Sequence, residues 1–280
     1  MRVCVSGASG FIGAHLCAAL RSRGDDVVET SMRDPSEAAR AASACDAFVN
    51  LSGETLAQRW NDRAKREILQ SRTAAPAKFF ETLATLDRRP AVYVSASAVG
   101  YYGTSETATF TEADPAGSGF LAHVCEQWER VAGTARTFGM RAACVRAGLV
   151  LSANGGALAR LLPIFKAGTG GRVGSGRQWY SWVHIDDAVG IFLLALDRID
   201  GAINATAPNP VRNAEFVETM ARVLHRPCAL PAPPFMIKLA LGEGATLVLD
   251  GQRVLPARAQ SEGYSFAFPE LETAFADLLK

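Results

Sequence analysis

The sequence predicts an α/β fold: a Rossmann-type, doubly wound and mostly parallel sheet with a small C-terminal lobe. Short apolar runs alternate with longer helical runs through the first half of the chain, which is typical of βαβ units. A glycine-rich turn, Gly7-x-x-Gly10-x-x-Gly13, directly follows the first apolar run. A chain of 280 residues is also long enough for one large domain and a smaller lobe.

Residues 1–150 are expected to form most of the sheet. The apolar runs predict strands at residues 2–6, 26–31, 47–51, 91–95 and 142–146. The runs between them predict helices at residues 12–23, roughly 61–86 and roughly 119–138. Residues 36–45 are too few for a helix, a strand and a second helix, so we expect a trimmed connection before Ala47.

The pattern changes after residue 151, and a glycine-dense stretch from Gly168 to Gly176 predicts a mobile segment. Residues 182–185 then predict a strand. Residues 186–196 predict a helix with Asp186 or Asp187 as a cap near its start. A last sheet strand is expected at residues 203–206, so residues of about 180–206 should complete the Rossmann sheet.

The smaller C-terminal substrate lobe is expected to combine residues 151–179 with residues 207–280. A helix is predicted from Asn213 to about His225, followed by a proline-rich break at residues 231–234 and two further helical pieces. Open α/β sheets bind ligands at the carboxyl ends of their strands. This architecture therefore predicts a dinucleotide at the glycine turn and a second ligand between the two parts.

Composition and charge exclude several classes of partner. The formal net charge is +1 and no basic block occurs, so neither nucleic acid nor an anionic membrane is expected. The longest apolar run, residues 188–196, is about half as long as a membrane-spanning helix, and no cationic and apolar leader is present. The six cysteines stand singly, and no His or Cys spacing fits a metal. We expect a reduced, cytoplasmic protein without a metal site.

The glycine-rich turn predicts a dinucleotide site. The first glycine allows a tight turn, the second lets backbone N–H groups approach the pyrophosphate, and the third lets the helix pack closely on the strand. The helix N-terminus adds partial positive charge. The alternative is an ordinary glycine turn between strand and helix. The cofactor contacts expected here are Gly7, Ser9, Gly10, Phe11, Ile12 and Gly13.

The end of the second strand distinguishes NAD from NADP. A carboxylate there holds the ribose diol of NAD, whereas a basic residue suits the 2′-phosphate of NADP. No acid ends this strand, and Arg33 lies just beyond it, which favours NADP. Glu29 is a competing diol ligand, but it lies in mid-strand. The alternative for Arg33 is a solvated loop arginine.

Further motifs match one protein family along the whole chain. They are Val49-Asn50-Leu51-Ser52-Gly53-Glu54, Gln70-Ser71-Arg72, Ser95-x-Ser97-Ala98-Val99-Gly100-Tyr101-Tyr102-Gly103, Trp128-Glu129, Arg146-x-Gly148, Gly174-x-Gly176-x-Gln178 and Trp182-Val183-His184-Ile185-Asp186-Asp187. With the glycine turn, they resemble an atypical extended short-chain dehydrogenase/reductase of the NAD-dependent epimerase/dehydratase superfamily, in an epimerase-like group of unassigned substrate.

The resemblance implies an NADP(H)-dependent oxidoreductase or epimerase that acts on a small polar or sugar-like substrate, with a homodimer as a possible assembly. It also implies further cofactor contacts after two strands. These are Leu51, Ser52, Gly53, Glu54, Arg72, Ser95 and Ala96. Arg72 could instead extend its charge into solvent, and the loop at Leu51 could be an ordinary turn.

The usual catalytic pair of short-chain dehydrogenases is absent. These enzymes use a tyrosine with a lysine four residues later, and no tyrosine of this chain has one. The corresponding positions are Phe120 and Val124, whose simplest role is packing. Ser97 resembles the catalytic serine and could orient a substrate. Tyr101 or Tyr102 could carry a proton, or both could be structural.

The expected substrate contacts lie after the glycine-dense segment. Gln178 and Trp179 close that segment, which is either a substrate lid or a surface loop, and His184 is either an acid–base group or a structural histidine. Two functions remain open: an NADP(H)-dependent oxidoreductase, or a catalytically inactive NADP(H)-binding sensor or scaffold. A true sugar-nucleotide epimerase is hard to sustain without the catalytic pair.

Overall fold

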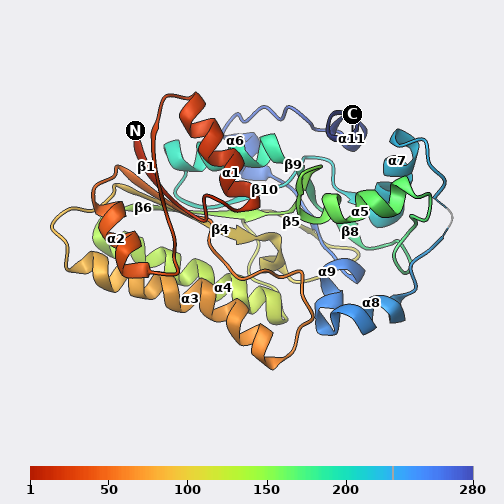
Figure 1. Cartoon of the computed structure of the whole chain (residues 1–280), viewed down its shortest axis with the longest axis horizontal. Coiled ribbons are helices and arrows are strands. Elements are labelled where there is room, and N and C mark those ends of the chain that lie inside the picture. Colours follow the sequence, from red (N-terminus) through yellow and green to blue (C-terminus); the bar gives the residue numbers. More distant parts are fainter. Residues whose placement is uncertain (229, 280) are drawn as a thin grey trace.

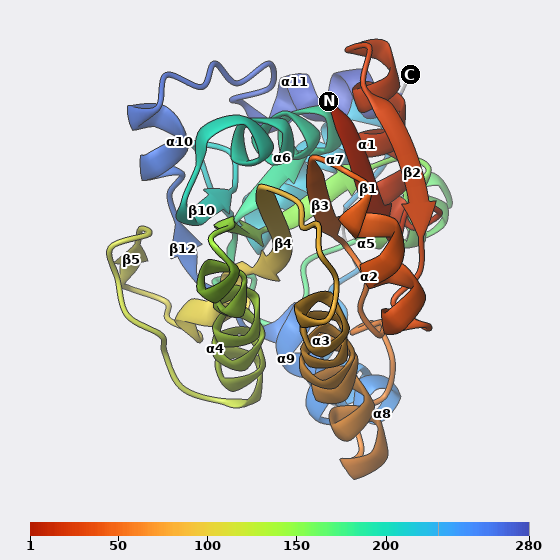
Figure 2. The same cartoon turned by 90° about the vertical axis from the view of Figure 1, so that its left-hand side faces the viewer.

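The computed structural model describes residues 1–228 and 230–279. Its centre is a six-stranded parallel sheet in the order β10-β6-β4-β3-β1-β2. Helices α1 and α6 cover one face, and α2, α3 and α4 cover the other (Figures 1 and 2). The strands are β1 (Arg2–Ser6), β2 (Asp26–Thr30), β3 (Ala47–Asn50), β4 (Val92–Ala98), β6 (Arg141–Ala147) and β10 (Gly201–Ala205).

Helices on both faces bury the strands from two sides, which is why the strands are apolar runs without alternation. Val3, Val5 and Val94 pack in the core beneath α1 and α6. On the opposite face, Phe48 and Phe79 stack with ring centroids 4.5 Å apart. The main helices are α1 (Phe11–Ser22), α2 (Pro35–Ser43), α3 (Asp62–Ala84), α4 (Phe120–Gly133) and α6 (Ile185–Arg198).

The trimmed connection predicted before Ala47 is confirmed. A single helix, α2, joins β2 to β3, and β3 pairs directly with β1. Asp34 caps α2 by accepting hydrogen bonds from the N–H groups of Ser36 and Glu37. The strand order therefore reverses between β1 and β3, which is where ligands bind in sheets of this kind.

The strand predicted at residues 182–185 forms as β9 (Trp182–His184), but it lies outside the central sheet. It pairs with β7 (Leu149–Ser152) in a separate two-stranded ladder. The strand predicted at residues 203–206 forms as β10 and completes the central sheet at its edge, beside β6. Residues 180–206 thus contribute one strand, not two, to that sheet.

The N-terminal cap of α6 differs from the sequence prediction. His184 is the cap, and its Nδ1 accepts a hydrogen bond of 3.1 Å from the N–H of Asp186. The carboxylate of Asp187 instead accepts hydrogen bonds from the N–H groups of Ala267 and Phe268, at 2.8 and 2.9 Å. Its charge is used to hold the C-terminal segment against α6.

The C-terminal lobe contains more helices than the two predicted after the proline-rich break. Leu158, Phe165, Phe216 and Phe275 share its core. Its helices are α5 (Gly156–Lys166), α7 (Asn213–Val223), α8 (Pro234–Leu241), α9 (Thr246–Leu249), α10 (Ala257–Ser261) and α11 (Leu271–Leu278). The lobe also contains the short strands β8 (Trp179–Tyr180), β11 (Val211–Arg212) and β12 (Arg253–Val254) and the 3₁₀ helix Glu243–Ala245. Strand β5 (Thr109–Phe110) and the 3₁₀ helices Val99–Tyr102 and Thr134–Phe138 belong to the N-terminal part of the chain.

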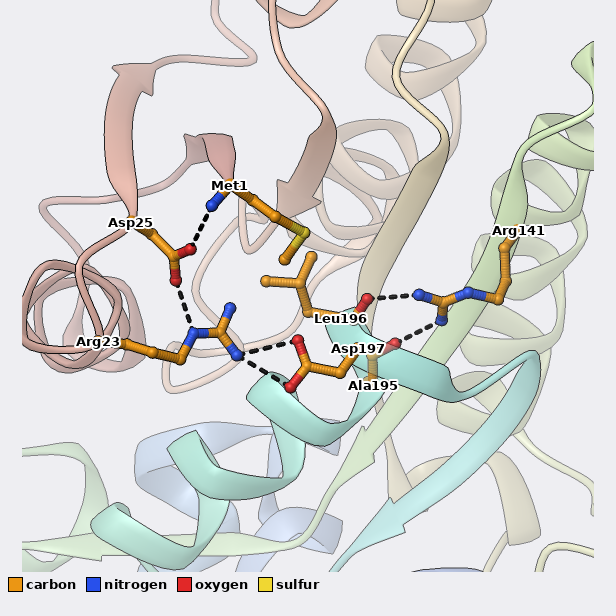
Figure 3. Close-up of polar contacts among 7 residues, drawn as sticks. All are labelled: Met1, Arg23, Asp25, Arg141, Ala195, Leu196 and Asp197. Carbon is orange, nitrogen blue, oxygen red and sulfur yellow. Dashed lines mark hydrogen bonds and ion pairs between the residues drawn. The ribbon is translucent and has the colours of Figure 1, made fainter.

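Ion pairs and hydrogen bonds to carbonyl groups lie at the amino ends of strands β1 and β6 (Figure 3). The Asp25 carboxylate joins the Met1 ammonium, at 2.7 Å, to the Arg23 guanidinium, at 2.6 Å. Arg23 also pairs with Asp197 near the end of α6, at 2.9 Å. Arg141 donates to the carbonyl of Ala195 at 2.7 Å, and also to those of Leu196 and Ile199. These contacts hold α1, α6 and the first strand together.

Candidate cofactor and catalytic site

The glycine turn has no space for side chains. Gly7 has φ +80°, and a Cβ on it would lie 3.0 Å from the carbonyl carbon of Leu51. A Cβ on Gly13 would lie 2.1 Å from the carbonyl oxygen of Gly7. Strand β1, helix α1 and the loop after β3 therefore approach each other more closely than any other residue would permit at these positions.

The start of α1 offers free backbone donors. Within the described chain, Gly10 caps α1 without a side-chain hydrogen bond, and the first turn carries no acidic residue. Such an N-terminus presents unpaired N–H groups and partial positive charge to an anion. Ser9 is exposed and Ile12 is half-buried beside this turn. The turn thus fits the pyrophosphate of a dinucleotide.

Phe11 connects this turn to the C-terminal lobe. Its ring lies against the backbone of Gly155 and Gly156, where a Cβ on Gly155 would be 2.4 Å from the ring. The contact places the turn between β7 and α5 directly beside the cofactor loop. Sequence reasoning assigned Phe11 to the cofactor alone and missed this contact between the two parts of the chain.

Arg33 and Glu29, the two residues expected to distinguish NADP from NAD, differ in their partners. Arg33 is exposed, and its guanidinium makes no hydrogen bond or ion pair within residues 1–228 and 230–279. Glu29, the competing diol ligand, forms an ion pair of 2.6 Å with Arg21 on α1. Arg21 therefore neutralises that carboxylate, whereas Arg33 keeps its charge available.

The loop after β3 is held against β1. The hydroxyl groups of Ser6 and Ser52 share a hydrogen bond of 2.5 Å, and the N–H of Ser52 donates to Asn50 Oδ1 at 3.1 Å. The N–H of Glu54 donates to the hydroxyl of Ser71 on α3. These contacts fix the backbone of residues 51–54 beside the glycine turn, as the predicted cofactor contacts there require.

Arg72 projects from α3 to the same loop. A Cβ on Gly53 would lie 3.0 Å from the Arg72 guanidinium, which donates to the carbonyl of Glu54 at 3.0 Å and lies 4.9 Å from the Trp128 ring. Burial lowers the pKa of Arg72. In the described chain no carboxylate lies within ion-pair distance of this guanidinium. Arg72 is thus a buried cation beside the predicted cofactor loop.

Strand register places three polar residues in one row across the sheet. Ser97 on β4 is the partner of Arg146 on β6, which is the partner of Asn204 on β10. All three are buried. Paired positions point to the same face of a sheet, so these side chains lie under α4, near the carboxyl edge.

Glu129 of α4 completes this row. The Ser97 hydroxyl donates to Glu129 Oε1 at 2.6 Å. The Arg146 guanidinium donates to both carboxylate oxygens, Nε to Oε1 and Nη2 to Oε2, each at 2.8 Å. Burial alone would lower the pKa of Arg146, but the hydrogen bonds and charge of Glu129 outweigh burial and raise it. The arrangement is a bidentate ion pair with a serine attached.

The two tyrosines predicted as proton carriers belong to the same network. The Tyr102 hydroxyl donates to Asn204 Oδ1 at 2.8 Å and accepts from Arg146 at 2.9 Å. Burial raises the pKa of Tyr102 to about 12. The Tyr101 ring lies 3.4 Å from the Arg146 guanidinium. Tyr102 is therefore held by two buried side chains, and a proton-carrying role for either tyrosine stays a prediction.

Sequence reasoning missed Glu129, Arg146 and Asn204 as members of the site. The sequence did contain one signal for them, because Arg146 is a charged residue in a run of apolar residues that forms a buried strand. Such a charge normally requires a buried partner. Ser95, in contrast, lies two residues before Ser97 on β4, is buried, and donates to the carbonyl of Ala96 at 2.9 Å.

The packing role predicted for Phe120 and Val124 is confirmed. Both belong to an apolar cluster with Trp60 and Ile68, and the Phe120 and Trp60 rings meet edge to face with centroids 5.2 Å apart. These two positions of α4 therefore pack against Trp60 and against Ile68 of α3.

The predicted substrate residues do not gather at Ser97. Gln178 donates to the carbonyls of Val173 and Val248, at 3.1 and 3.0 Å, and so anchors the glycine-dense segment. The Trp179 indole donates to the carbonyl of Glu106 at 3.0 Å. His184 is buried, stacks 3.9 Å from the Phe268 ring, and has its pKa lowered by burial. Gln178 thus makes contacts within the lobe, Trp179 contacts the segment before α4, and His184 lies at the start of α6.

The described residues include neither a membrane-spanning helix nor a cluster of metal ligands. No helix among them is long and apolar enough to cross a membrane. Nor do three His, Cys, Asp or Glu side chains come together there in a way that could hold a metal ion.

The sequence matches two family descriptions. Residues 3–207 match the NAD dependent epimerase/dehydratase family, and residues 232–278 match a domain of unknown function (DUF1731). The chain is 41% identical to the epimerase family protein SDR39U1 homolog, chloroplastic, of Arabidopsis thaliana, covering 100% of this chain and 87% of that protein. It is 36% identical to the epimerase family protein YfhF of Bacillus subtilis, covering 100% and 98%.

Solved structures agree with the sequence matches. The human epimerase family protein SDR39U1, solved with NADPH, superposes with a TM-score of 0.90 at 33% identity and covers 99% of both chains. A nucleoside-diphosphate sugar epimerase from Corynebacterium glutamicum superposes with a TM-score of 0.81 at 31% identity, covering 100% of this chain and 58% of that one. This chain therefore belongs to the NAD dependent epimerase/dehydratase family, among the epimerase family proteins similar to SDR39U1.

Proposed function

We propose that this protein binds NADP(H) and interconverts a small polar or sugar-like alcohol with its carbonyl form. When bound, NADP(H) would accept or supply the hydride. The observation that supports cofactor binding is the N-terminus of α1, which no side chain caps. It follows a glycine turn so tightly packed that Gly13 could not carry a Cβ. The human protein solved with NADPH, at 33% identity, supports the same cofactor.

Four groups of this chain would hold the cofactor. The α1 N-terminus would bind the pyrophosphate, and Arg33 would bind the 2′-phosphate. Residues 51–54 and the buried Arg72 would border the adenosine or the nicotinamide ribose of the cofactor. Ser97, at the carboxyl end of β4, would orient the substrate oxygen.

A fluorescence titration with NADPH and, separately, NADH tests the cofactor assignment. Arg33→Ala should weaken NADPH binding about tenfold or more and leave NADH binding unchanged, because a charge-assisted phosphate contact contributes about 1.5–3 kcal/mol. Arg130→Ala is the matched control, since this exposed arginine lies in the last turn of α4, away from the glycine turn and β2. Equal loss for both cofactors, or no NADPH binding by the wild type, would refute the assignment.

One observation favours a second candidate function, an NADP(H)-binding sensor or scaffold without turnover. Phe120 and Val124, which by the resemblance correspond to the usual catalytic pair, pack in an apolar cluster, and the Tyr102 hydroxyl is hydrogen-bonded to Asn204 and Arg146. A panel of alcohols with NADP⁺ and carbonyls with NADPH separates the two. Turnover that disappears in Ser97→Ala supports the enzyme, whereas tight NADPH binding without turnover supports the sensor.

A further inference from the structure

We propose that Glu129 accepts the proton of Ser97 while Ser97 accepts the proton of the substrate alcohol. The Ser97–Glu129 pair would thus replace the absent Tyr/Lys pair. This inference rests on the proposed function, which supplies the alcohol at Ser97 and NADP⁺ as the oxidant.

The geometry is that of a serine beside its base. The Ser97 Oγ to Glu129 Oε1 distance is 2.6 Å, within the range of hydrogen bonds from a hydroxyl to an ionised carboxylate. The two residues lie on β4 and α4, so regular elements hold both groups. A nucleophile or proton acceptor in contact with an oriented base is a recurring catalytic arrangement.

Arg146 is the positioning residue of this pair. It binds both oxygens of Glu129 at 2.8 Å, which fixes the plane of the carboxylate and directs Oε1 at Ser97. Its third hydrogen bond, to the Tyr102 hydroxyl, and its stacking on the Tyr101 ring hold the guanidinium in turn. An arginine held in this way serves as a rigid bidentate fork.

Exposure indicates where the proton leaves. Ser97 is 3% exposed and the Arg146 side chain 5%, whereas the Glu129 side chain is 15% exposed. Glu129 is therefore the member of the row that water reaches most easily. A proton received from Ser97 can pass from Glu129 to solvent without crossing the sheet.

The proposed oxidation conserves every atom and electron. The substrate O–H bond breaks and its proton joins Ser97 Oγ, while the original Ser97 proton moves to Glu129 Oε1. The electron pair left on the substrate oxygen forms the carbonyl, as the hydrogen on the adjacent carbon departs with its electron pair to NADP⁺. Glu129 then returns its proton to water, which restores the starting carboxylate.

The test compares Glu129→Gln and Glu129→Ala with Glu126→Gln in alcohol oxidation by NADP⁺. Glu126 is an exposed glutamate one turn earlier on α4 and is the matched control. Glu129→Gln should lower kcat about 10²–10⁴-fold with KM changed less than about threefold, as expected for loss of a general base. NADPH affinity by fluorescence and the thermal midpoint are measured for every variant.

Chemical rescue separates a base from a structural contact. Added formate should restore part of the kcat of Glu129→Ala, because it can occupy the vacated space beside Ser97, and it should not rescue Ser97→Ala. Turnover by Glu129→Gln within about threefold of the wild type, or losses in both Glu129 variants without formate rescue, would overturn the inference alone. A wild type that binds NADPH but oxidises no alcohol would overturn both the inference and the enzymatic function.

Discussion

Replacement of Arg146 by methionine tests whether the network at Ser97 is a truly buried ion pair. The Arg146 and Glu129 side chains are 5% and 15% exposed and share two hydrogen bonds of 2.8 Å. Methionine has a similar length but supplies no charge and no donor. The carboxylate would then keep the Ser97 hydroxyl as its side-chain donor in the described chain, and Tyr102 would lose one partner.

The expected cost follows from this loss of compensation. Breaking a buried ion pair by removing one partner destabilises a protein by about 3–5 kcal/mol, whereas an exposed pair contributes about 0–1 kcal/mol. Arg63 and Glu67 on α3 provide the exposed control, with side chains 82% and 46% exposed. We therefore expect Arg146→Met to lower the free energy of unfolding by about 3 kcal/mol or more, and Arg63→Met by less than about 1 kcal/mol.

Urea denaturation followed by circular dichroism measures both variants without cofactor. A second variant, Glu129→Gln together with Arg146→Met, should recover part of the loss, because it removes the uncompensated charge. A cost for Arg146→Met no larger than that for Arg63→Met would refute the reasoning. It would show that water reaches Glu129 and Arg146 in solution and screens the attraction between their charges.

Three further predictions concern other parts of the chain. Gly13→Ala should abolish NADPH binding in a fluorescence titration, because its Cβ would meet a carbonyl oxygen at 2.1 Å, whereas Gly133→Ala on α4 should not, because its Cβ would meet only the Arg136 side chain, at 3.7 Å. Asp187→Ala should lower the free energy of unfolding by about 2–4 kcal/mol in urea denaturation, since two N–H groups lose their acceptor and the Tyr264 hydroxyl loses one of two acceptors, while Asp186→Ala, at a side chain 66% exposed, should cost less than about 1 kcal/mol. Burial lowers the pKa of His184 below its ordinary 6.5, so the unfolded chain binds the proton more readily and the free energy of unfolding should fall as the pH drops below about 6.5. In that pH range the urea midpoint of His184→Asn should depend less on pH than that of the wild type, and an equal pH dependence would contradict this.

Local sequence patterns were sufficient to predict the sheet and its glycine turn. Each strand of the central sheet lies within a few residues of its predicted position, because apolar runs and glycine spacing act over short stretches of chain. The trimmed connection before β3 followed from length alone. The prediction that Asp186 or Asp187 caps α6 failed because it depended on residues distant in the sequence. The Asp187 carboxylate accepts hydrogen bonds from residues 80 and 81 positions away, which no local sequence rule could reveal.

The residues near Ser97 show the same division. The sequence by itself determined the parallel α/β fold, the glycine turn, the position of Arg33 and the absence of a Tyr/Lys pair, because each depends on residue type and short spacing. Only the tertiary structure decided that Ser97 meets Glu129, which is 32 residues away, and that Arg146 holds that carboxylate. The physical reason is strand register: pairing between β4 and β6 sets Ser97 beside Arg146, and α4 then brings Glu129 over both.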